Sequence, residues 1–405
     1  MPTRKRCDII DKSMGAEIKE RIYVCHTYYH VYIACLKELA LREGKSGAGK
    51  ADLVLSKMSN DFRSLRERAA ACGLFDAVIE FDEKDYTFFP ELVELKKDRG
   101  NIAANMLQRI RFCRRYAQLE EPYVPVDFTR YRDIYVFCDS DPIGYYLSYK
   151  KIRYHAVEDG LDCIRYRDTA RDDNRGHFGL KAFMAARGWI FIQNGYGKYC
   201  IDMEVNDLSA LDHPTAKMKE VPRESLTARL TEEDKKLLTA LFIENRDQLI
   251  QALTKAGESG RPKVLILTEP LCKDLSMRRR LFEDMINEYG TVGGQAAVIV
   301  VKPHPRDKLD YTEIFPQHIV LDGFFPMEIL NFVQIGEGML FDRVVTVFTV
   351  PSSIHCAREK VYLGAPYMDR YEDPEEHRSV TNSAFTVTGT GDAGNSLKVG
   401  GEKKE

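Results

Sequence analysis

The sequence lacks any apolar run of the about 18 residues that a membrane-spanning helix requires. The segment 1–20 is polar and charged and has no apolar core of the kind found in a secretory signal peptide. An excess of charge of one sign is also missing, because the formal net charge is only −3, which gives no reason to expect a nucleic-acid partner. These absences predict a cytoplasmic protein without a membrane-spanning segment.

Paired cysteine spacings are absent as well. The ten cysteines occur singly, several of them inside apolar segments, and no CxxC or Cys/His spacing typical of a zinc site is present. This distribution indicates buried thiols in a reducing compartment and gives no metal site.

What the sequence does contain is enough apolar material for more than one core. Its 405 residues are 44% hydrophobic, which allows two or three domains of ordinary size. A solvated helix face is the simpler explanation of its two local basic clusters, and an anionic membrane or glycolipid surface is the alternative. The clusters are Arg109, Arg111, Arg114 and Arg115, and Arg278, Arg279 and Arg280.

Short apolar strands alternate with segments of helical spacing in the first part of the chain, which predicts a parallel, doubly wound sheet. Residues 165–215, rich in Arg, Asp, Gly and aromatic residues, suggest loops, and 225–255 looks helical. We expect a first Rossmann-like domain over 1–255 that includes a helical connection over 215–255. Strands are expected at 22–25, 53–56, 76–81, 134–138 and 152–157, and a helical region at 91–118 that is interrupted near Gly100.

A second alternating series follows the linker 257–262 and predicts a second Rossmann-like domain over 256–405, with a flexible tail after about residue 380. The fold class is therefore α/β, with two Rossmann-like halves and a cleft between them. Strands are expected at 264–267, 297–301, 318–321, 344–348 and 361–363, and helices at 274–289, 326–332 and 352–359.

Three nucleotide-site patterns fail on their context. The P-loop-like segment 44–50 is followed by Ala51 where Ser or Thr is needed, and the GxGxxG at 389–394 has no strand before it. Asp139 and Asp141 could hold a divalent metal. Helix capping by Asp141, directly before Pro142, is the favoured explanation.

The segment 297–305 ends a buried strand in Lys302-Pro303-His304-Pro305. The two prolines restrict the backbone on both sides of His304, so its imidazole is held at the carboxyl end of a strand, where open α/β sheets bind ligands. A rigid surface turn without function explains the same residues.

The segment Glu158-Asp159-Gly160 closes the last strong strand of the first half. Neighbouring strand side chains alternate, so only one of the two acids can face a given site. One acid could act as a general base while the other orients the turn or raises the pKa of its neighbour. Solvated acids at a strand end are the alternative.

Two further motifs end or follow strands of the second half. Ser352 and Ser353 are expected to open a helix, where hydroxyls and unpaired N–H groups would form an anion site. Glu328 begins a short helix, where its carboxylate could accept both hydroxyls of a ribose or interact favourably with the helix dipole.

Together these motifs resemble the bacterial sialyltransferases of GT-B fold, which include glycosyltransferase family 52 and the capsular polysialyltransferases. The shared order is an acidic pair with Gly, then His-Pro, then a Ser/Thr pair. Thr27-Tyr-Tyr-His30 is similar to the Thr-Pro-Tyr-His of these enzymes, Leu267-Thr-Glu269-Pro-Leu to their Leu-Thr-Gln-Pro-Leu, and Pro326-Met-Glu328 to their Pro-x-Glu. Tyr28 and Glu269 depart from the pattern, and Glu269 changes the charge near the expected cleft.

The resemblance implies an inverting, metal-independent transfer of sialic acid or a related nonulosonate from a CMP-sugar to a lipooligosaccharide or capsule acceptor. No cofactor is implied. Glu158 would be the general base, assisted by Asp159, and His304 would serve the departing phosphate. Lys302, Pro305, Glu328, Ser352 and Ser353 would bind the donor, and Thr27, His30, Gly160 and Glu269 would line the acceptor side or the cleft.

Two other functions remain open at this point. One is a teichoic-acid-type transferase that uses CDP-glycerol, and the other is a non-catalytic nucleotide-binding partner of a capsule-assembly complex. Either enzyme is expected in the cytoplasm with a glycan or glycolipid acceptor. Peripheral membrane contact and a homodimer are both compatible with the sequence.

Overall fold

The computed structural model describes residues 18–44, 49–137, 139, 141–160, 164, 176–336, 338–349, 351–373 and 398–399. The chain divides into two compact units, Met1–Asp61 with Ala69–Arg229 and Phe62–Arg68 with Leu230–Glu405. We had placed the boundary at 255, whereas this division groups residues 230–255 with the second unit. The P-loop-like segment 44–50 lies partly outside the described residues, and the GxGxxG segment 389–394 lies wholly outside them.

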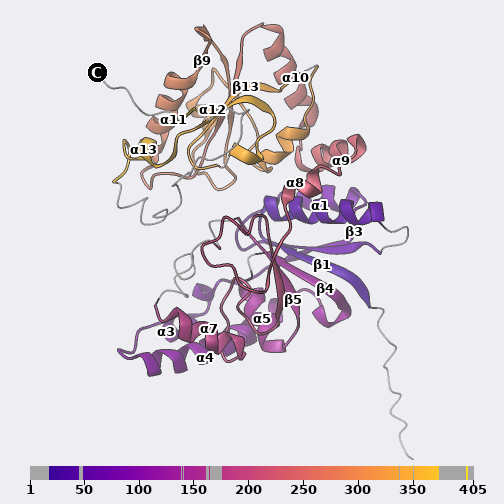
Figure 1. Ribbon diagram of the computed structural model, residues 1–405, viewed down its shortest axis with the longest axis vertical. Helices are drawn as coiled ribbons and strands as arrows, with labels where there is room; N and C mark the ends of the chain where they lie inside the picture. Colours follow the sequence, from indigo (N-terminus) through magenta and orange to yellow (C-terminus); the bar gives the residue numbers. More distant parts are fainter. Residues whose placement is uncertain are drawn as a thin grey trace, which may run out of the picture. The chain divides into compact units, whose positions relative to one another are not determined.

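The first unit contains a seven-stranded sheet in the order β3-β2-β1-β4-β5-β6-β7, with parallel pairing throughout. Helix α1 covers one face, and α4 and α5 cover the other (Figure 1). Apolar β1 and β2 are buried because both faces are covered. The strands are β1 (Lys19–Cys25), β2 (Ala51–Ser56), β3 (Phe75–Phe81), β4 (Tyr131–Phe137), β5 (Tyr154–Val157), β6 (Cys200–Val205) and β7 (Met218–Glu220).

The helices of this unit show the expected interruption near Gly100, because α3 ends at Leu95, Gly100 has a positive φ of 79°, and Asn101 caps α4 through the N–H of Ala104. The unit contains α1 (Tyr28–Gly44), the end of α2 (Leu65–Ala71), α3 (Pro90–Leu95), α4 (Ile102–Glu120), α5 (Pro142–Lys150), α7 (Phe178–Ala186), α8 (Arg223–Thr227) and the 3-10 turns η1 (Tyr86–Phe88), η2 (Glu121–Tyr123) and η3 (Phe128–Arg130).

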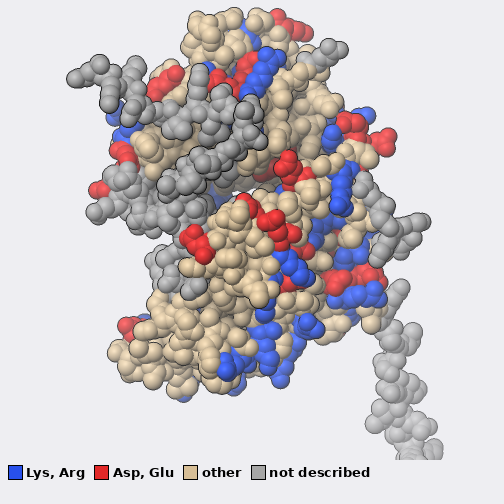
Figure 2. All heavy atoms as spheres, viewed as in Figure 1, with Lys and Arg blue, Asp and Glu red and all other residues tan. Residues whose placement is uncertain are grey.

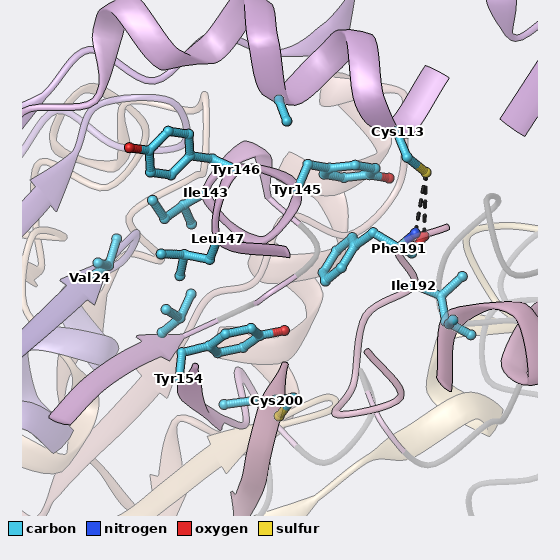
Figure 3. Close-up of a cluster of buried hydrophobic side chains, with 14 of the residues drawn as sticks. Val24, Cys113, Ile143, Tyr145, Tyr146, Leu147, Tyr154, Phe191, Ile192 and Cys200 are labelled. Carbon is cyan, nitrogen blue, oxygen red and sulfur yellow. Dashed lines mark hydrogen bonds between the residues drawn. The ribbon is translucent and has the colours of Figure 1, made fainter. Parts of the chain in front are cut away.

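The core of the first unit joins α4, α5 and the segment around Phe191 (Figure 3). Tyr145 packs against Phe191 with ring centroids 4.7 Å apart, and the N–H of Phe191 donates to Cys113 Sγ at 3.3 Å. Seven cysteines among the described residues are free thiols, and all except Cys72 are buried. That burial confirms the prediction made from their apolar surroundings.

The second unit contains a six-stranded parallel sheet in the order β12-β11-β8-β13-β14-β15, and an antiparallel pair β9-β10. Its strands are β8 (Lys263–Leu267), β9 (Thr291–Val292), β10 (Gln295–Ala296), β11 (Val298–Lys302), β12 (Ile319–Val320), β13 (Phe341–Thr346), β14 (Ala357–Tyr362) and β15 (Lys398–Val399). Its helices and 3-10 turns are α9 (Glu232–Phe242), α10 (Arg246–Glu258), α11 (Leu275–Tyr289), α12 (Tyr311–Ile314), α13 (Gly364–Met368), η5 (Met327–Phe332) and η6 (Pro351–Ser353). Two parallel α/β sheets confirm the predicted fold class.

Three sequence-based predictions of elements were wrong. Residues 352–359 form the short η6 turn and the start of β14, because β14 pairs along its length with β13 and this pairing overrides the local helical pattern. The expected loops at 165–215 include α7 and β6, which pairs with β5. Helix α10 runs to Glu258 and so takes up the start of the expected linker.

Candidate active site

The acidic pair Glu158-Asp159 follows β5 at the carboxyl edge of the first sheet. The Glu158 side chain turns inward, is 2% exposed, and accepts the N–H of Asn206 at 2.9 Å. Burial raises the pKa of Glu158 above its ordinary value, against the opposing effect of Arg223. The Asp159 side chain is 25% exposed, and Gly160 has φ of 124°, which an L side chain rarely adopts. The two acids therefore occupy different environments.

His30, in the first turn of α1, holds the Asp159 carboxylate. Its Nδ1 accepts the backbone N–H of His26 at 3.0 Å, so the proton of the neutral ring lies on Nε2, which donates to Asp159 Oδ1. Burial lowers the pKa of His30, although Asp159 opposes this shift. Thr27 Oγ1 accepts the N–H of His30 at 3.2 Å, and the His30 ring stacks on Phe137. The structure thus brings together Thr27, His30 and Asp159.

His26, which we had not singled out, is a second buried histidine beside this pair. Its Nε2 lies 2.7 Å from Glu83 Oε2 and 3.3 Å from Asp141 Oδ2. Burial lowers the pKa of His26, but the carboxylates of Asp141, Glu83 and Asp159 outweigh burial and raise it to about 9. His26 is therefore an imidazolium at neutral pH. Its position directly after β1, four residues before His30, was the signal that could have identified it.

Asp139 and Asp141 make separate contacts. Asp139 is buried and accepts the N–H of Asn194 at 2.7 Å and the hydroxyl of Tyr154 at 3.1 Å. Asp141 occupies the N-cap position of α5 with Pro142 after it, as predicted, but its side chain makes no capping bond and lies near His26. No cluster of three or more metal-type ligands occurs among the described residues.

His304 follows β11 at the carboxyl edge of the second sheet. Its backbone N–H donates to Thr268 Oγ1 at 3.1 Å, and its Nδ1 accepts the N–H of Arg306 at 3.1 Å. The proton of the neutral ring is therefore on Nε2. Burial, together with Arg306 and Lys302, lowers the pKa of His304 to about 4. The ring is thus a neutral hydrogen-bond donor through Nε2 at physiological pH.

Lys302 has an internal role instead of the donor contact that we had expected. Its side chain is buried, and Nζ donates to the carbonyls of Pro303 and Gly323, both at 2.9 Å. The ammonium group lies 4.2 Å from the Phe325 ring centroid. Burial lowers the pKa of Lys302 to about 7. These bonds tie the turn that carries His304, including the half-buried Pro305, to the loop after β12.

Glu269, after β8, anchors the loop after β13. Its carboxylate accepts the N–H of Phe348 at 3.0 Å, the N–H of Thr349 at 2.8 Å, and the hydroxyls of Thr346 and Thr349 at 2.9 Å each. Because every partner is a donor, a carboxylate suits this position. Glu269 stands where the family pattern has Gln, and its negative charge therefore serves hydrogen bonds inside the second unit.

The Ser352-Ser353 pair lies in η6, and the predicted anion site at a helix N-terminus was wrong. Only a three-residue 3-10 turn is present, because the chain enters β14 directly afterwards. The exposed Ser352 hydroxyl remains available to a ligand. Asn331 of η5 joins this turn, since its Nδ2 donates to the Ser353 carbonyl at 2.8 Å and its Oδ1 accepts the N–H of His355 at 2.8 Å.

Glu328 lies in the first turn of η5, where it is half-buried. Burial raises the pKa of Glu328, and its own backbone N–H and Lys302 oppose the shift. Because Asn331 belongs to the same turn, the Glu328 and Ser353 segments are joined by hydrogen bonds. Sequence reasoning missed Asn331, which lies three residues after Glu328.

Each sheet thus presents proton-handling side chains at its carboxyl edge, Asp159 with His30 in the first unit and His304 in the second, as expected for ligand sites of open α/β sheets. Two parallel α/β units in one chain are the fold class of the GT-B glycosyltransferases. The model of glycosyltransferase family 52 matches residues 112–353, more than half of the chain, and the chain belongs to this family. The family named from the motifs is therefore confirmed.

A curated relative from Haemophilus influenzae, described as an uncharacterized protein, is 34% identical over 106 residues. The match covers 25% of this chain and 31% of the relative. The chain therefore matches about a third of that relative's length.

Solved structures of other proteins follow a similar chain course. UDP-GlcNAc 2-epimerase from Neisseria meningitidis bound to UDP-GlcNAc is 9% identical, with 85% of this chain and 82% of that chain covered and a TM-score of 0.41. The calicheamicin glycosyltransferase CalG4 is 12% identical, with 90% and 84% covered and a TM-score of 0.40. SnogD from Streptomyces nogalater is 9% identical, with 91% and 85% covered and a TM-score of 0.36.

Proposed function

We propose that this glycosyltransferase transfers sialic acid or a related nonulosonate from a CMP-sugar to a surface glycan, with inversion and without a metal ion. The observation that carries the proposal is the half-exposed Asp159 carboxylate held by a neutral, tautomerically defined His30. The supporting observations in the second unit are the neutral His304 and the hydroxyl of Ser352.

The first unit supplies the base in this proposal. A base must reach the acceptor hydroxyl, and the Asp159 side chain is partly exposed whereas that of Glu158 is buried against Asn206. We therefore assign the base to Asp159, which replaces Glu158 in the role that we first gave it. His30 donates to Oδ1 and would so fix the orientation of the carboxylate. Glu158 supports the turn.

The second unit serves the leaving group. The acceptor oxygen bonds to the anomeric carbon as its proton passes to Asp159, and the bond from that carbon to the phosphate oxygen breaks with its electron pair on CMP. The phosphate gains charge in this step, so donors that are already in place stabilise the transition state more than the ground state. His304 Nε2–H and the hydroxyls of Ser352 and Ser353 would be these donors, and Glu328 would bind the ribose.

The assignment of the base is tested by Asp159→Asn, measured as transfer from CMP-Neu5Ac to a galactoside. The amide keeps the shape of the side chain but cannot take the proton, so kcat should fall by about 100-fold or more. Glu158→Gln should lose much less, because its amide oxygen can still accept the Asn206 N–H. Asp212→Asn, at an exposed site in the same unit, is the matched control. Full activity of Asp159→Asn would overturn the assignment.

The donor is tested by the thermal shift that CMP, CDP and UDP produce. One histidine and two hydroxyls can serve a single phosphate, so CMP should stabilise the wild type most and His304→Ala less. A clear preference for CDP would instead favour the CDP-glycerol transferase. Binding of CMP without donor hydrolysis or transfer to any acceptor would identify a non-catalytic nucleotide-binding protein.

A further inference from the structure

Helix α7 turns an apolar face to solvent. Its exposed side includes Leu180 and Phe183, and the Phe183 side chain is 47% exposed. Trp189, which follows the end of the helix, is 55% exposed. The rings of Phe183 and Trp189 lie with their centroids 6.3 Å apart, so the two aromatic side chains form one projection. No described element covers these side chains enough to bury them.

Helix α4 adds cations to this surface. Arg111 and Arg114 are exposed on its outer side, together with Leu107. Arg114 and Trp189 line the same surface hollow, which places the outer side of α4 beside the aromatic projection. We call the surface of Leu107, Arg111, Arg114, Leu180, Phe183 and Trp189 the α4–α7 surface.

The exposed charges that helices α4 and α7 contribute to the α4–α7 surface have one sign. Helices α4 and α7 together contain a single acidic residue, Glu120, and it is buried at the end of α4. Lys181 of α7 lines a second hollow with three further cations, Lys96, Lys97 and Arg109, and one acid, Asp98. The Arg187 guanidinium lies 3.3 Å from the Phe183 ring centroid. In Figure 2 the lower edge of the first unit, where Figure 1 places these helices, shows Lys and Arg spheres along uncharged atoms and Asp or Glu spheres at its left end.

Exposed apolar and aromatic side chains with cations beside them suit the interfacial region of an anionic bilayer, which is apolar toward the acyl chains and negatively charged at the headgroups. Trp and Phe enter the region between headgroups and acyl chains, while Arg and Lys remain at the lipid phosphates. A second copy of the chain fits this surface less well. A two-fold contact would place the arginines of one copy against the same arginines of the other.

We propose that the α4–α7 surface docks the first unit on an anionic phospholipid bilayer. The proposal does not depend on the identity of the nucleotide-sugar donor. Docking there would hold the enzyme at the membrane, where an acceptor glycan carried on a lipid would be found. It also gives a function to Arg111 and Arg114 of the basic cluster beyond that of a solvated helix face, whereas Arg115 pairs with Glu91.

Vesicle binding by the full chain provides the test, and Trp189 is a built-in probe because it is the only tryptophan in the sequence. Vesicles of phosphatidylcholine with phosphatidylglycerol should carry the protein on flotation and shift the tryptophan emission to the blue. Vesicles of phosphatidylcholine alone should do neither, and high salt should weaken binding because it screens the cations.

Two double variants separate the contributions. Arg111→Glu/Arg114→Glu and Leu180→Ser/Phe183→Ser should each lower the partition coefficient at least about tenfold, because each removes one of the two attractions. Arg279→Glu/Arg280→Glu, which reverses the same number of exposed charges on α11, and Met339→Ser, at an exposed apolar site in the second unit, should leave it unchanged. All four should keep the wild-type circular dichroism spectrum.

Wild-type protein that neither floats with anionic vesicles nor shows the blue shift would overturn the proposal, and this result needs no variant to fold. Equal binding by the α4–α7 variants and the controls would also overturn it. A dimer in lipid-free solution that the same two variants abolish would assign the surface to self-association instead. Failure here would leave the Asp159 and CMP experiments unaffected, because they use soluble substrates.

Discussion

At the scale of single residues, the candidate site depends on which proton each group carries. His26, His30 and His304 are all partly or wholly buried, yet their pKa values move in different directions. Burial lowers the pKa of His30 and His304, whereas three carboxylates around His26 outweigh burial and raise its pKa. The same residue type thus provides two neutral donors and one fixed cation.

The charge on His26 predicts a pH-dependent contribution to stability. A histidine with a folded pKa of about 9 and an unfolded pKa of about 6.5 stabilises the fold fully below about pH 6.5 and loses this contribution as the pH rises through 9. The loss of unfolding free energy caused by His26→Gln should therefore be larger at about pH 6 than at about pH 10. Chemical unfolding of variant and wild type at both pH values measures it.

His213→Gln is the matched control, because His213 is exposed in the same unit. Its effect should be small and the same at both pH values. Each comparison is made with the wild type at one pH, so the titration of Lys302, whose pKa is lowered to about 7, cancels. A pH-independent effect of His26→Gln would mean that His26 is not a cation in the folded protein.

At the scale of elements, the loops after parallel strands do the positioning. Glu269 after β8 holds the loop after β13, Lys302 at the end of β11 holds the loop after β12, and Asn331 joins η5 to η6. The loops of the second sheet are thereby tied to one another. The sheet supplies a common edge, and these three side chains set the loop geometry.

Glu269→Gln tests this role of the loops. The amide oxygen can take the place of Oε1, but the NH2 group would then face the Phe348 N–H, which Oε2 accepts at 3.1 Å, and the remaining hydrogen bonds would lose the carboxylate charge, at a cost of about 1–3 kcal/mol. We expect a lower unfolding free energy and a raised KM for the donor, with a smaller change in kcat. Steady-state kinetics with varied CMP-sugar and chemical unfolding measure these effects.

The control for this variant is Glu283→Gln, which alters an exposed acid on α11 that pairs with Arg279. Surface pairs of this kind contribute little, so its effects should be small. If Glu269→Gln changed neither stability nor donor KM, the loop after β13 would not depend on this carboxylate.

Prediction of the elements from sequence succeeded where the apolar pattern was strong. Strand β11 with its Lys-Pro-His-Pro turn and the interruption near Gly100 both occur as expected. The helix expected after Ser352 does not, because residues 357–362 are drawn into the sheet by β13. Pairing between strands is a tertiary contact, and the local pattern does not contain it.

At the scale of the whole molecule, each unit is built on a parallel sheet with its candidate ligand groups at the carboxyl edge. No helix among the described residues has the length and apolarity to cross a membrane. Both units carry their own clusters of buried apolar side chains. The family match runs from α4 of the first unit to η6 of the second, so it includes the assigned base and the His304 turn.

The proposed chemistry predicts that removal of divalent metal leaves activity intact. CMP departs with a single phosphate, for which His304 and the serine hydroxyls would suffice, and Asp139 and Asp141 are turned to contacts inside the first unit. Transfer rates in EDTA should stay within about twofold of those with added Mg²⁺ or Mn²⁺, because no step requires a Lewis acid. A loss of activity in EDTA that metal restores would contradict the proposed mechanism.

The sequence by itself determined the two parallel α/β sheets, the acidic pair after β5 and the His-Pro turn after β11, because strand patterns and prolines act locally. Only the tertiary structure decided which acid is exposed, since Asp159 is held by His30 from 129 residues earlier in the chain and Glu158 by Asn206 from a later loop. It also turned Lys302 and Glu269 inward and gave His26 its charge. Burial, pKa and hydrogen-bond direction depend on neighbours in space, and folding brings those neighbours together.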